Sequence, residues 1–278
     1  MNFIEIVDQI LKSSDPDAIG LPRQNDATVA IQNLANEIMS ESKGLIGAEG
    51  TESDYFKCCE DRFATLLTMA LTYLPAGSRL LDIGNAPGYL AIMLAQAGYE
   101  VDGINLSDAW NSTYPDPKYL ELFRVKSADV EKVALPYPDG SFDAIVFTEV
   151  LEHIAIRHPR EILPEFRRVL TDTGAVILST PNVCNVSNIV SLLQGNNIFW
   201  DSDIFYGGTD RHNREFTPRE TRSLFEDNGF ETLQFFGMND HANWRAGSAH
   251  HIYDFQAAHG TPDHDLMRNT IVGVFAKA

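Results

Sequence analysis

The sequence has few cysteines and no long apolar run, so it gives little support for disulfide bonds or membrane insertion. It holds three cysteines, Cys58, Cys59 and Cys184, too few for a disulfide framework. Cys58 and Cys59 are adjacent and would pair only in a strained ring, which favours a reducing cytoplasm. No apolar run reaches the roughly twenty residues that a membrane span needs. The N-terminus carries an acid, Glu5, where a signal peptide carries base, so we expect a soluble cytoplasmic protein without membrane association.

Positive charge is also scarce. Lys and Arg number 21 against 39 Asp and Glu, a formal net charge of −18 at pH 7. So acidic a surface repels phosphate backbones and anionic lipid, which argues against a general nucleic-acid binder. The sequence also lacks the interleaved basic and aromatic residues with which proteins hold single strands. A hydrophobic content of 44% over 278 residues suits one globular domain with a smaller covering element.

The order of helical and strand patterns predicts the fold. Residues 1–75 carry apolar residues at helical spacing, and we expect them to form a helical lid or substrate-covering region. Over residues 76–278, short apolar runs alternate with helices, which indicates an α/β fold with a mostly parallel, doubly wound sheet. Its ligand crevice is expected at the carboxyl ends of the first strands. The seven predicted strands are residues 79–83, 100–104, 121–125, 142–148, 175–179, 231–236 and 270–276.

Two inserts interrupt this predicted domain. The first, at about 183–215, is rich in aromatic residues that suit either stacking on a ring-shaped substrate or filling a satellite core. The second, at about 239–268, is polar and too long for a hairpin turn. Its side chains that could line the entrance to a site are His241, Trp244, Arg245, His250 and His251.

The first predicted strand runs into a glycine-bearing turn, Leu80–Gly88. Gly84 permits a tight turn, and Gly88 lets a ligand approach the backbone closely. A bare strand-to-helix turn would leave the acidic Asp82 unexplained. The Gly-x-Gly-x-x-Gly spacing of dinucleotide sites is absent, which disfavours a nucleotide-dependent oxidoreductase.

This turn resembles the first motif of class I S-adenosylmethionine-dependent methyltransferases, with Ala86 in place of the usual middle glycine. Ser127–Val130 resembles the segment whose aspartate meets the adenine amino group, and Leu135–Asp143 resembles the approach to the fourth strand. The resemblance covers residues 76–180 and implies a Rossmann-like class I fold with S-adenosyl-L-methionine as cofactor. The cofactor-binding residues that it implies are Asp82, Gly84, Asn85, Gly88, Asn105, Asp129 and Glu149.

One departure concerns the ribose of that cofactor. The second predicted strand ends in Asn105, where the family usually has an acid that grips both hydroxyls. An amide still accepts one hydrogen bond and donates another. Asp102 is a register-shifted alternative, but its side chain would point to the opposite face of the strand. Together with Ala86, this departure leaves open a non-catalytic scaffold that keeps the fold without a tight grip on the cofactor.

After the fourth predicted strand, Glu149, Glu152 and His153 stand at i, i+3 and i+4. One helical turn would gather these two carboxylates and the imidazole on one face. Two hard oxygens and a nitrogen suit a divalent cation. Many methyltransferases of this class carry a similar Glu-x-x-Glu-His without a metal, as hydrogen-bonding groups around the cofactor. The trio alone therefore leaves both interpretations open.

A later segment, Asp210–Pro218, is similar to the His-x-x-Glu-aromatic-Thr signature of small-RNA 3′-terminal ribose 2′-O-methyltransferases, as is Thr180–Asn182 to their Thr-Pro-Asn. Ubiquinone-pathway catechol O-methyltransferases share the Glu-x-x-Glu-His. The resemblance implies one Mg²⁺ or Mn²⁺ ion, and the ligands that it implies are Glu149, Glu152, His153 and His212. Whichever histidine binds the metal less tightly, His153 or His212, would accept the proton.

These motifs predict metal-assisted O-methylation of a vicinal diol or catechol. A cation chelated by two adjacent oxygens lowers the pKa of a hydroxyl and fixes its attacking lone pair. The net charge of −18 favours a small-molecule or sugar-containing acceptor over RNA. An alternative drops the metal and methylates a nitrogen or oxygen with a histidine as plain base. The sequence leaves the oligomeric state open, a homodimer included.

Overall fold

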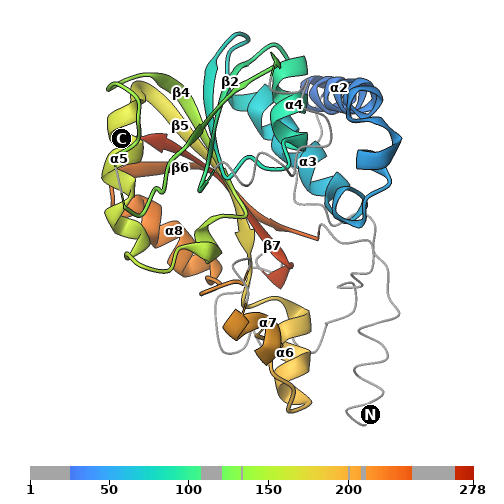
Figure 1. Cartoon of the computed structure of the whole chain (residues 1–278), viewed down its shortest axis with the longest axis vertical. Helices are drawn as coiled ribbons and strands as arrows, with labels where there is room; N and C mark the ends of the chain where they lie inside the picture. Colours follow the sequence, from blue (N-terminus) through green and yellow to red (C-terminus); the bar gives the residue numbers. More distant parts are fainter. Residues whose placement is uncertain (1–25, 108–120, 133, 200, 208–210, 240–266) are drawn as a thin grey trace.

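A seven-stranded sheet lies at the centre of the molecule (Figure 1). The computed structural model describes residues 26–107, 121–132, 134–199, 201–207, 211–239 and 267–278. The strand order is β3-β2-β1-β4-β5-β7-β6, and β7 runs antiparallel to both of its neighbours. The strand bounds are β1 Arg79–Ile83, β2 Glu100–Asn105, β3 Arg124–Ser127, β4 Phe142–Thr148, β5 Leu170–Pro181, β6 Phe230–Met238 and β7 Thr270–Lys277. The predicted α/β fold with a mostly parallel, doubly wound sheet is confirmed.

Helices cover both faces of this sheet (Figure 1). On one face lie α3 Asp54–Tyr73 and α4 Tyr89–Gln96, with α2 Asp26–Thr51 packed on these two helices, and on the other lie α5 Leu163–Val169 and α8 Pro218–Glu226. Side chains alternate along a strand. Leu80 of β1 therefore packs in the hydrophobic cluster of α3 and α4, and Leu81 in that of α5 and α8. Within the described ranges, no helix combines the length and the apolar character needed to cross a membrane.

Two predicted boundaries are wrong. β3 begins at Arg124 instead of residue 121, because its pairing with β2 starts where Arg124 lies opposite Asp102. The Nη2 atom of Arg124 lies 2.7 Å from Oδ1 of that aspartate. β5 begins at Leu170 instead of residue 175, since Leu170 already pairs with Phe142 before a register shift. Hydrophobic periodicity carries no information about either pairing.

The N-terminal helices α2 and α3 share one hydrophobic core with the sheet. Ile38 of α2 and Phe56 and Leu67 of α3 are buried in the same cluster as Leu80. Ser53 caps α3, because its hydroxyl accepts a hydrogen bond from the Phe56 N–H at 3.2 Å. These helices are thus a layer of the domain, and their role as a lid stays a prediction.

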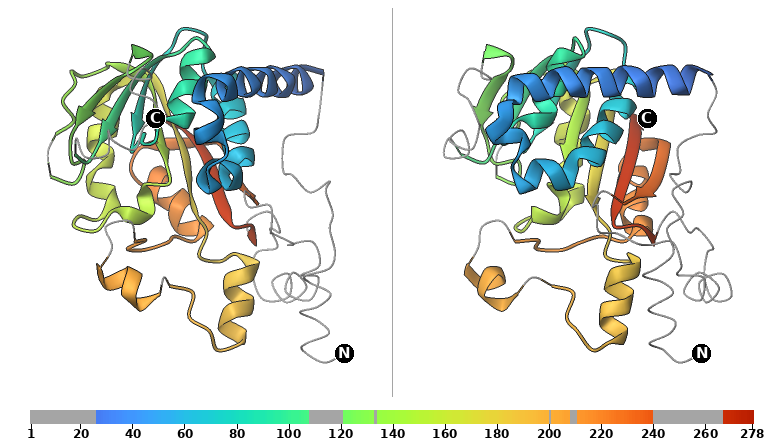
Figure 2. Two further views of the ribbon diagram at one scale, coloured as in Figure 1. Left: turned by 45° about the vertical axis from the view of Figure 1, so that its right-hand side comes forward. Right: turned by 90° about the vertical axis from the view of Figure 1, so that its right-hand side faces the viewer.

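The first predicted insert leaves the sheet after β5. It carries α6 (Val186–Leu193) and α7 (Ser202–Gly207), which stand away from the sheet in every view (Figures 1 and 2). Phe199 is 61% exposed and Tyr206 is 82% exposed, so these two rings do not fill a satellite core. The second predicted insert falls almost entirely outside the described residues, and so do its side chains named above, His241, Trp244, Arg245, His250 and His251.

Candidate active site

The carboxyl ends of β1, β2 and β4 meet at one edge of the sheet, where the glycine-bearing turn begins. Gly84 follows β1 with a φ of +76°, and a Cβ added there would lie 2.5 Å from Val150 Cγ2. Gly88 has a φ of +90° and stands at the N-cap of α4. A side chain is excluded at the first position and strained at the second. The backbone at this helix N-terminus is therefore bare enough for a ligand to approach it closely.

A cleft lies between this turn and α3. Five of the seven predicted cofactor-binding residues line it: Asp82, Gly84, Asn85, Gly88 and Glu149. Its open volume of about 30 Å³ has room for only a few water molecules. The rings of Tyr55, Phe63 and Tyr89 also line it and pack together, with centroids 6.2–6.3 Å apart. We therefore expect these rings to move aside when a cofactor-sized ligand binds.

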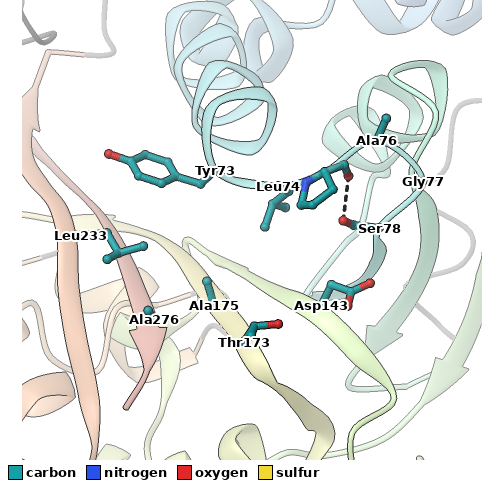
Figure 3. Close-up of a pocket in the computed structure, with 11 residues that line it drawn as sticks. Tyr73, Leu74, Ala76, Gly77, Ser78, Asp143, Thr173, Ala175, Leu233 and Ala276 are labelled. Atoms are coloured by element: carbon teal, nitrogen blue, oxygen red, sulfur yellow. Dashed lines mark hydrogen bonds between the residues drawn. The ribbon is translucent and has the colours of Figure 1, made fainter.

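A larger depression of about 320 Å³ lies at the opposite edge of the sheet (Figure 3). Two of its polar side chains are engaged in hydrogen bonds of the fold itself. The Asp143 carboxylate accepts the Arg79 N–H at 2.9 Å, and the Ser78 hydroxyl donates to the Pro75 carbonyl at 2.7 Å. Side-chain chemistry, and not cavity size, therefore marks the candidate active site.

Asp82 of β1 brings a buried carboxyl group to the wall of the cleft. Its side chain is 2% exposed. Burial raises the pKa of Asp82 from 3.8 to about 7, because a carboxylate is poorly solvated there. A positive charge bound beside it would favour the ionised form again. Asp82 is therefore suited to pair with a cationic ligand.

Arg62 of α3 supplies a buried guanidinium to the same cleft. Its Nη1 lies 3.3 Å from Glu149 Oε2, and its Nη2 donates a hydrogen bond to Cys59 Sγ at 3.0 Å. The other oxygen of Glu149 accepts from the Ser179 hydroxyl at 2.7 Å. A guanidinium can bind a carboxylate through two parallel hydrogen bonds. No sequence motif marks Arg62; the available signal is an arginine on the apolar face of a helix, next to Phe63.

The backbone of Glu149 is left-handed, with a φ of +54°. A 3-10 turn begins only afterwards and spans Leu151–His153. The prediction of one helical turn over residues 149–153 is therefore wrong, because Glu149 lies outside the turn and its N–H donates instead to the Ser179 carbonyl at 2.9 Å. Its carboxylate consequently pairs with Arg62, whereas Glu152 and His153 lie together with a later histidine.

Glu152 is fully buried behind this turn. Its Oε2 accepts a hydrogen bond from Thr180 Oγ1 at 2.9 Å, whereas its Oε1 has no hydrogen-bond partner within the described part of the chain. Burial, and secondly the charge of Glu149, raise the pKa of Glu152 well above its usual value. A buried polar atom without a partner costs free energy. Oε1 thus marks a point where a cation or a donor would be bound favourably.

His153 and His212 face each other beside Glu152, with ring centroids 5.1 Å apart. His153 Nδ1 lies 3.0 Å from the Arg211 carbonyl oxygen, which only accepts. In the neutral ring the proton is therefore on Nδ1 and the lone pair on Nε2. His212 Nδ1 is held in the same way, 2.8 Å from Glu215 Oε1. Histidines that ligate metals are typically oriented by such a hydrogen bond at the other nitrogen.

The later histidine segment is fixed to the turn by main-chain hydrogen bonds. The N–H groups of Asn213 and Arg214 both donate to the Glu152 carbonyl, at 2.8 and 3.2 Å. The side-chain amide of Asn213 donates to the His153 carbonyl at 2.8 Å. One ligand atom from each of Glu152, His153 and His212 lies within 4.8 Å of the others. Three of the four predicted metal ligands are therefore together.

Glu149 is outside this cluster, since Ser179 and Arg62 occupy its carboxylate. The remaining donors are one carboxylate oxygen and two imidazole nitrogens. This set fits a divalent transition metal better than Mg²⁺, which prefers oxygen ligands, and it leaves coordination positions for a substrate. Glu152 Oε1, which has no hydrogen-bond partner among the described residues, is available as a ligand for such a cation.

Asn105 and Asp129 lie beyond the lining of the cleft. Asn105 is buried at the end of β2, and its Oδ1 accepts the Ala86 N–H at 3.2 Å, which ties this strand to the glycine-bearing turn. Asp129 Oδ1 accepts the Glu131 N–H at 3.0 Å. The alternative to Asn105, Asp102, is paired with an arginine of β3. The roles of Asn105 and Asp129 in cofactor binding stay predictions.

A glycine-bearing turn with a buried acid, at the carboxyl edge of a Rossmann-like sheet, defines the class I methyltransferase type of protein. The family profile described as "Methyltransferase domain" matches residues 55–234. The chain therefore belongs to this family and is an S-adenosylmethionine-dependent methyltransferase.

Comparison with individual proteins agrees with this assignment. The ubiquinone biosynthesis O-methyltransferase of Thiobacillus denitrificans is 29% identical over 174 residues, which cover 59% of this chain and 68% of the relative. The 27-O-demethylrifamycin SV methyltransferase of Amycolatopsis mediterranei is 36% identical over 121 residues, and this match covers only 42% of each chain. A solved S-adenosylmethionine-dependent methyltransferase from Archaeoglobus fulgidus is 16% identical, with a TM-score of 0.55 over 78% of this chain and 94% of that chain. At this identity the structural match shows the fold alone.

The raised pKa of Asp82 leads to a prediction about cofactor affinity. If Asp82 pairs with the positive charge of S-adenosylmethionine, its carboxyl, which is largely neutral below pH 7, must first lose a proton. We expect the affinity to rise as pH approaches 7 from below, by up to about tenfold per pH unit. Calorimetric titration between about pH 5.5 and 7.5 measures this, with Asp82→Asn as the variant that removes the dependence. An affinity independent of pH in the unmodified protein would contradict it.

Proposed function

We propose that this protein is an O-methyltransferase that uses a divalent cation, Mg²⁺ or Mn²⁺, to methylate a hydroxyl of a vicinal diol or catechol. The observation that carries the proposal is the cluster of Glu152, His153 and His212 near the carboxyl edge of the sheet. The ubiquinone and rifamycin relatives are both named as methyltransferases that act on oxygen, which supports an oxygen acceptor.

The residues of the chain divide the work between two neighbouring positions. In the cleft, Asp82 pairs with the positive charge of the cofactor and Arg62 holds its carboxylate. At the cluster, Glu152 Oε1 and the Nε2 atoms of His153 and His212 would hold the cation, which would supply the acidification of the acceptor hydroxyl. The histidine that binds the cation less tightly would release its Nε2 to accept the hydroxyl proton. The hydroxyl oxygen would then bond the methyl carbon as the carbon–sulfur bond breaks.

The acceptor that we propose is a small molecule or carries a sugar. A net charge of −18 disfavours a nucleic-acid substrate, whose backbone needs basic residues. Phe199 and Tyr206 of the insert are exposed and available to contact a ring. Their position after β5 is on the same edge of the sheet as the cluster.

Removal of the metal tests the proposal. With a simple catechol such as 3,4-dihydroxybenzoate as acceptor, we expect EDTA to lower turnover by at least about a hundredfold, and added Mn²⁺ or Mg²⁺ to restore it. Cofactor affinity, measured by calorimetry, should not change, because Asp82 and Arg62 hold the cofactor without the metal. Undiminished turnover in EDTA would reject the metal and favour the metal-independent alternative. Failure to bind S-adenosylmethionine at all would favour the non-catalytic scaffold.

A further inference from the structure

Two thiols lie side by side on α3, outside the lining of the cleft. Cys58 Sγ and Cys59 Sγ are 3.4 Å apart. Cys58 is half-buried and can be reached from solvent, while Cys59 is buried at 2% exposure. A direct disulfide is disfavoured, because adjacent Cα atoms are about 3.8 Å apart and disulfides usually need about 4.4–6.8 Å. A third atom that bridges both sulfurs avoids this restriction.

The buried thiol is connected to the cofactor cleft through one side chain. Cys59 Sγ accepts a hydrogen bond from Arg62 Nη2 at 3.0 Å, and a guanidinium beside sulfur stabilises a thiolate. The same guanidinium lies 3.3 Å from Glu149 and lines the cleft. A group attached to this sulfur therefore displaces Arg62, and the displacement is felt where the cofactor binds.

We propose that Cys58 and Cys59 form a binding site for thiophilic compounds of the trivalent arsenical class, and that their binding lowers the affinity for the cofactor. Thiolates are soft ligands that prefer soft atoms such as arsenic. The two sulfurs are 3.4 Å apart, close enough for one such atom to bond to both. An aryl arsenoxide forms two As–S bonds, its As–O bonds break, and the oxygen leaves with both thiol protons as water. No atom is oxidised or reduced. The modified Cys59 sulfur no longer holds Arg62 in place.

Phenylarsine oxide is the probe that tests this site on the full chain. We expect mass spectrometry to find one phenylarsenic group per chain, and calorimetry to find a Kd for S-adenosylmethionine at least about tenfold higher. A dithiol such as 2,3-dimercaptopropanol should restore the affinity, and a monothiol at equal concentration should not. One bound arsenical with unchanged cofactor affinity would overturn the proposal, as would no binding.

Single-cysteine variants supply the matched controls. Cys58→Ser leaves the contact between Cys59 and Arg62 intact, so it should bind the cofactor normally and ignore phenylarsine oxide. Cys184→Ser keeps both thiols of α3 and should respond like the unmodified protein. Equal sensitivity of Cys58→Ser and Cys184→Ser would overturn the proposal. Because the readout is cofactor binding, the outcome is independent of the metal and the acceptor proposed above.

Discussion

Replacement of His212 with alanine is expected to lower kcat by about a thousandfold and to leave cofactor affinity unchanged. The ring is fixed by Glu215 and lies against His153, and it is not part of the cofactor cleft. Its loss removes one of the nitrogen atoms proposed to bind the metal, without disturbing Asp82 or Arg62. Single-turnover kinetics with a catechol acceptor, beside calorimetry with S-adenosylmethionine, separate the two quantities.

His158→Ala is the matched control for this variant. His158 is exposed, five residues beyond His153, and its Nδ1 only accepts the Arg160 N–H at the start of a short turn. It should retain nearly full activity. Calorimetry with Mn²⁺ then tells a metal ligand from a plain base: His212→Ala should bind Mn²⁺ more weakly. Normal Mn²⁺ binding together with a lowered kcat would leave His212 only a base, and normal kcat would remove it from the mechanism.

Replacement of Arg62 with methionine is expected to weaken S-adenosylmethionine binding by about a hundredfold. The guanidinium is the partner of Glu149 and lines the cleft, so the variant loses the group that we propose to hold the cofactor carboxylate. It also leaves the negative charge of Glu149 in the cleft wall, where it repels that carboxylate. Equilibrium calorimetry measures the change, and thermal unfolding by circular dichroism verifies that α3 still packs.

Two further variants sharpen this test. Arg62→Lys keeps the charge but cannot reach Glu149 and Cys59 together, so its affinity should lie between those of the unmodified protein and Arg62→Met. Arg79→Ala removes a surface arginine at the other end of β1, whose Nε is 3.8 Å from a Glu100 oxygen. It should bind the cofactor normally. Normal binding by Arg62→Met would show that this guanidinium takes no part in holding the cofactor.

The parts of the fold that the sequence predicts are those set by local pattern. β1 and β4 match their predicted bounds because each is a short apolar run flanked by turn residues. β3, by contrast, is polar and exposed on most of its length, so its bounds depend on pairing with β2. The start of α8 is likewise local, since Thr217 and Glu220 bond each other reciprocally in a capping box, a pattern typical of helix starts. The left-handed backbone of Glu149 has no such local pattern.

The candidate site was predictable only where a motif carries it. The glycine-bearing turn and the approach of His212 to Glu152 follow patterns that a sequence displays. Arg62 does not, because its place in the site depends on its contact with Glu149, a residue far away in sequence. The turn of the chain at Glu149 is also tertiary in origin, since the N–H of this residue bonds to Ser179 on the next strand. A helical-wheel argument therefore groups Glu149 with Glu152 and His153, whereas its carboxylate pairs with Arg62.

We expect the narrow space between α3 and α4 to limit how fast the cofactor exchanges. Phe63 and Tyr89 are almost fully buried, so separating their rings requires the two helices to shift relative to one another. Collective movements of this kind take microseconds to milliseconds or longer. We expect this movement of the two helices to limit the exchange of S-adenosylhomocysteine for a new molecule of S-adenosylmethionine. Acceptors of very different reactivity would then show the same maximal kcat, because the helix movement and not the acceptor would determine it.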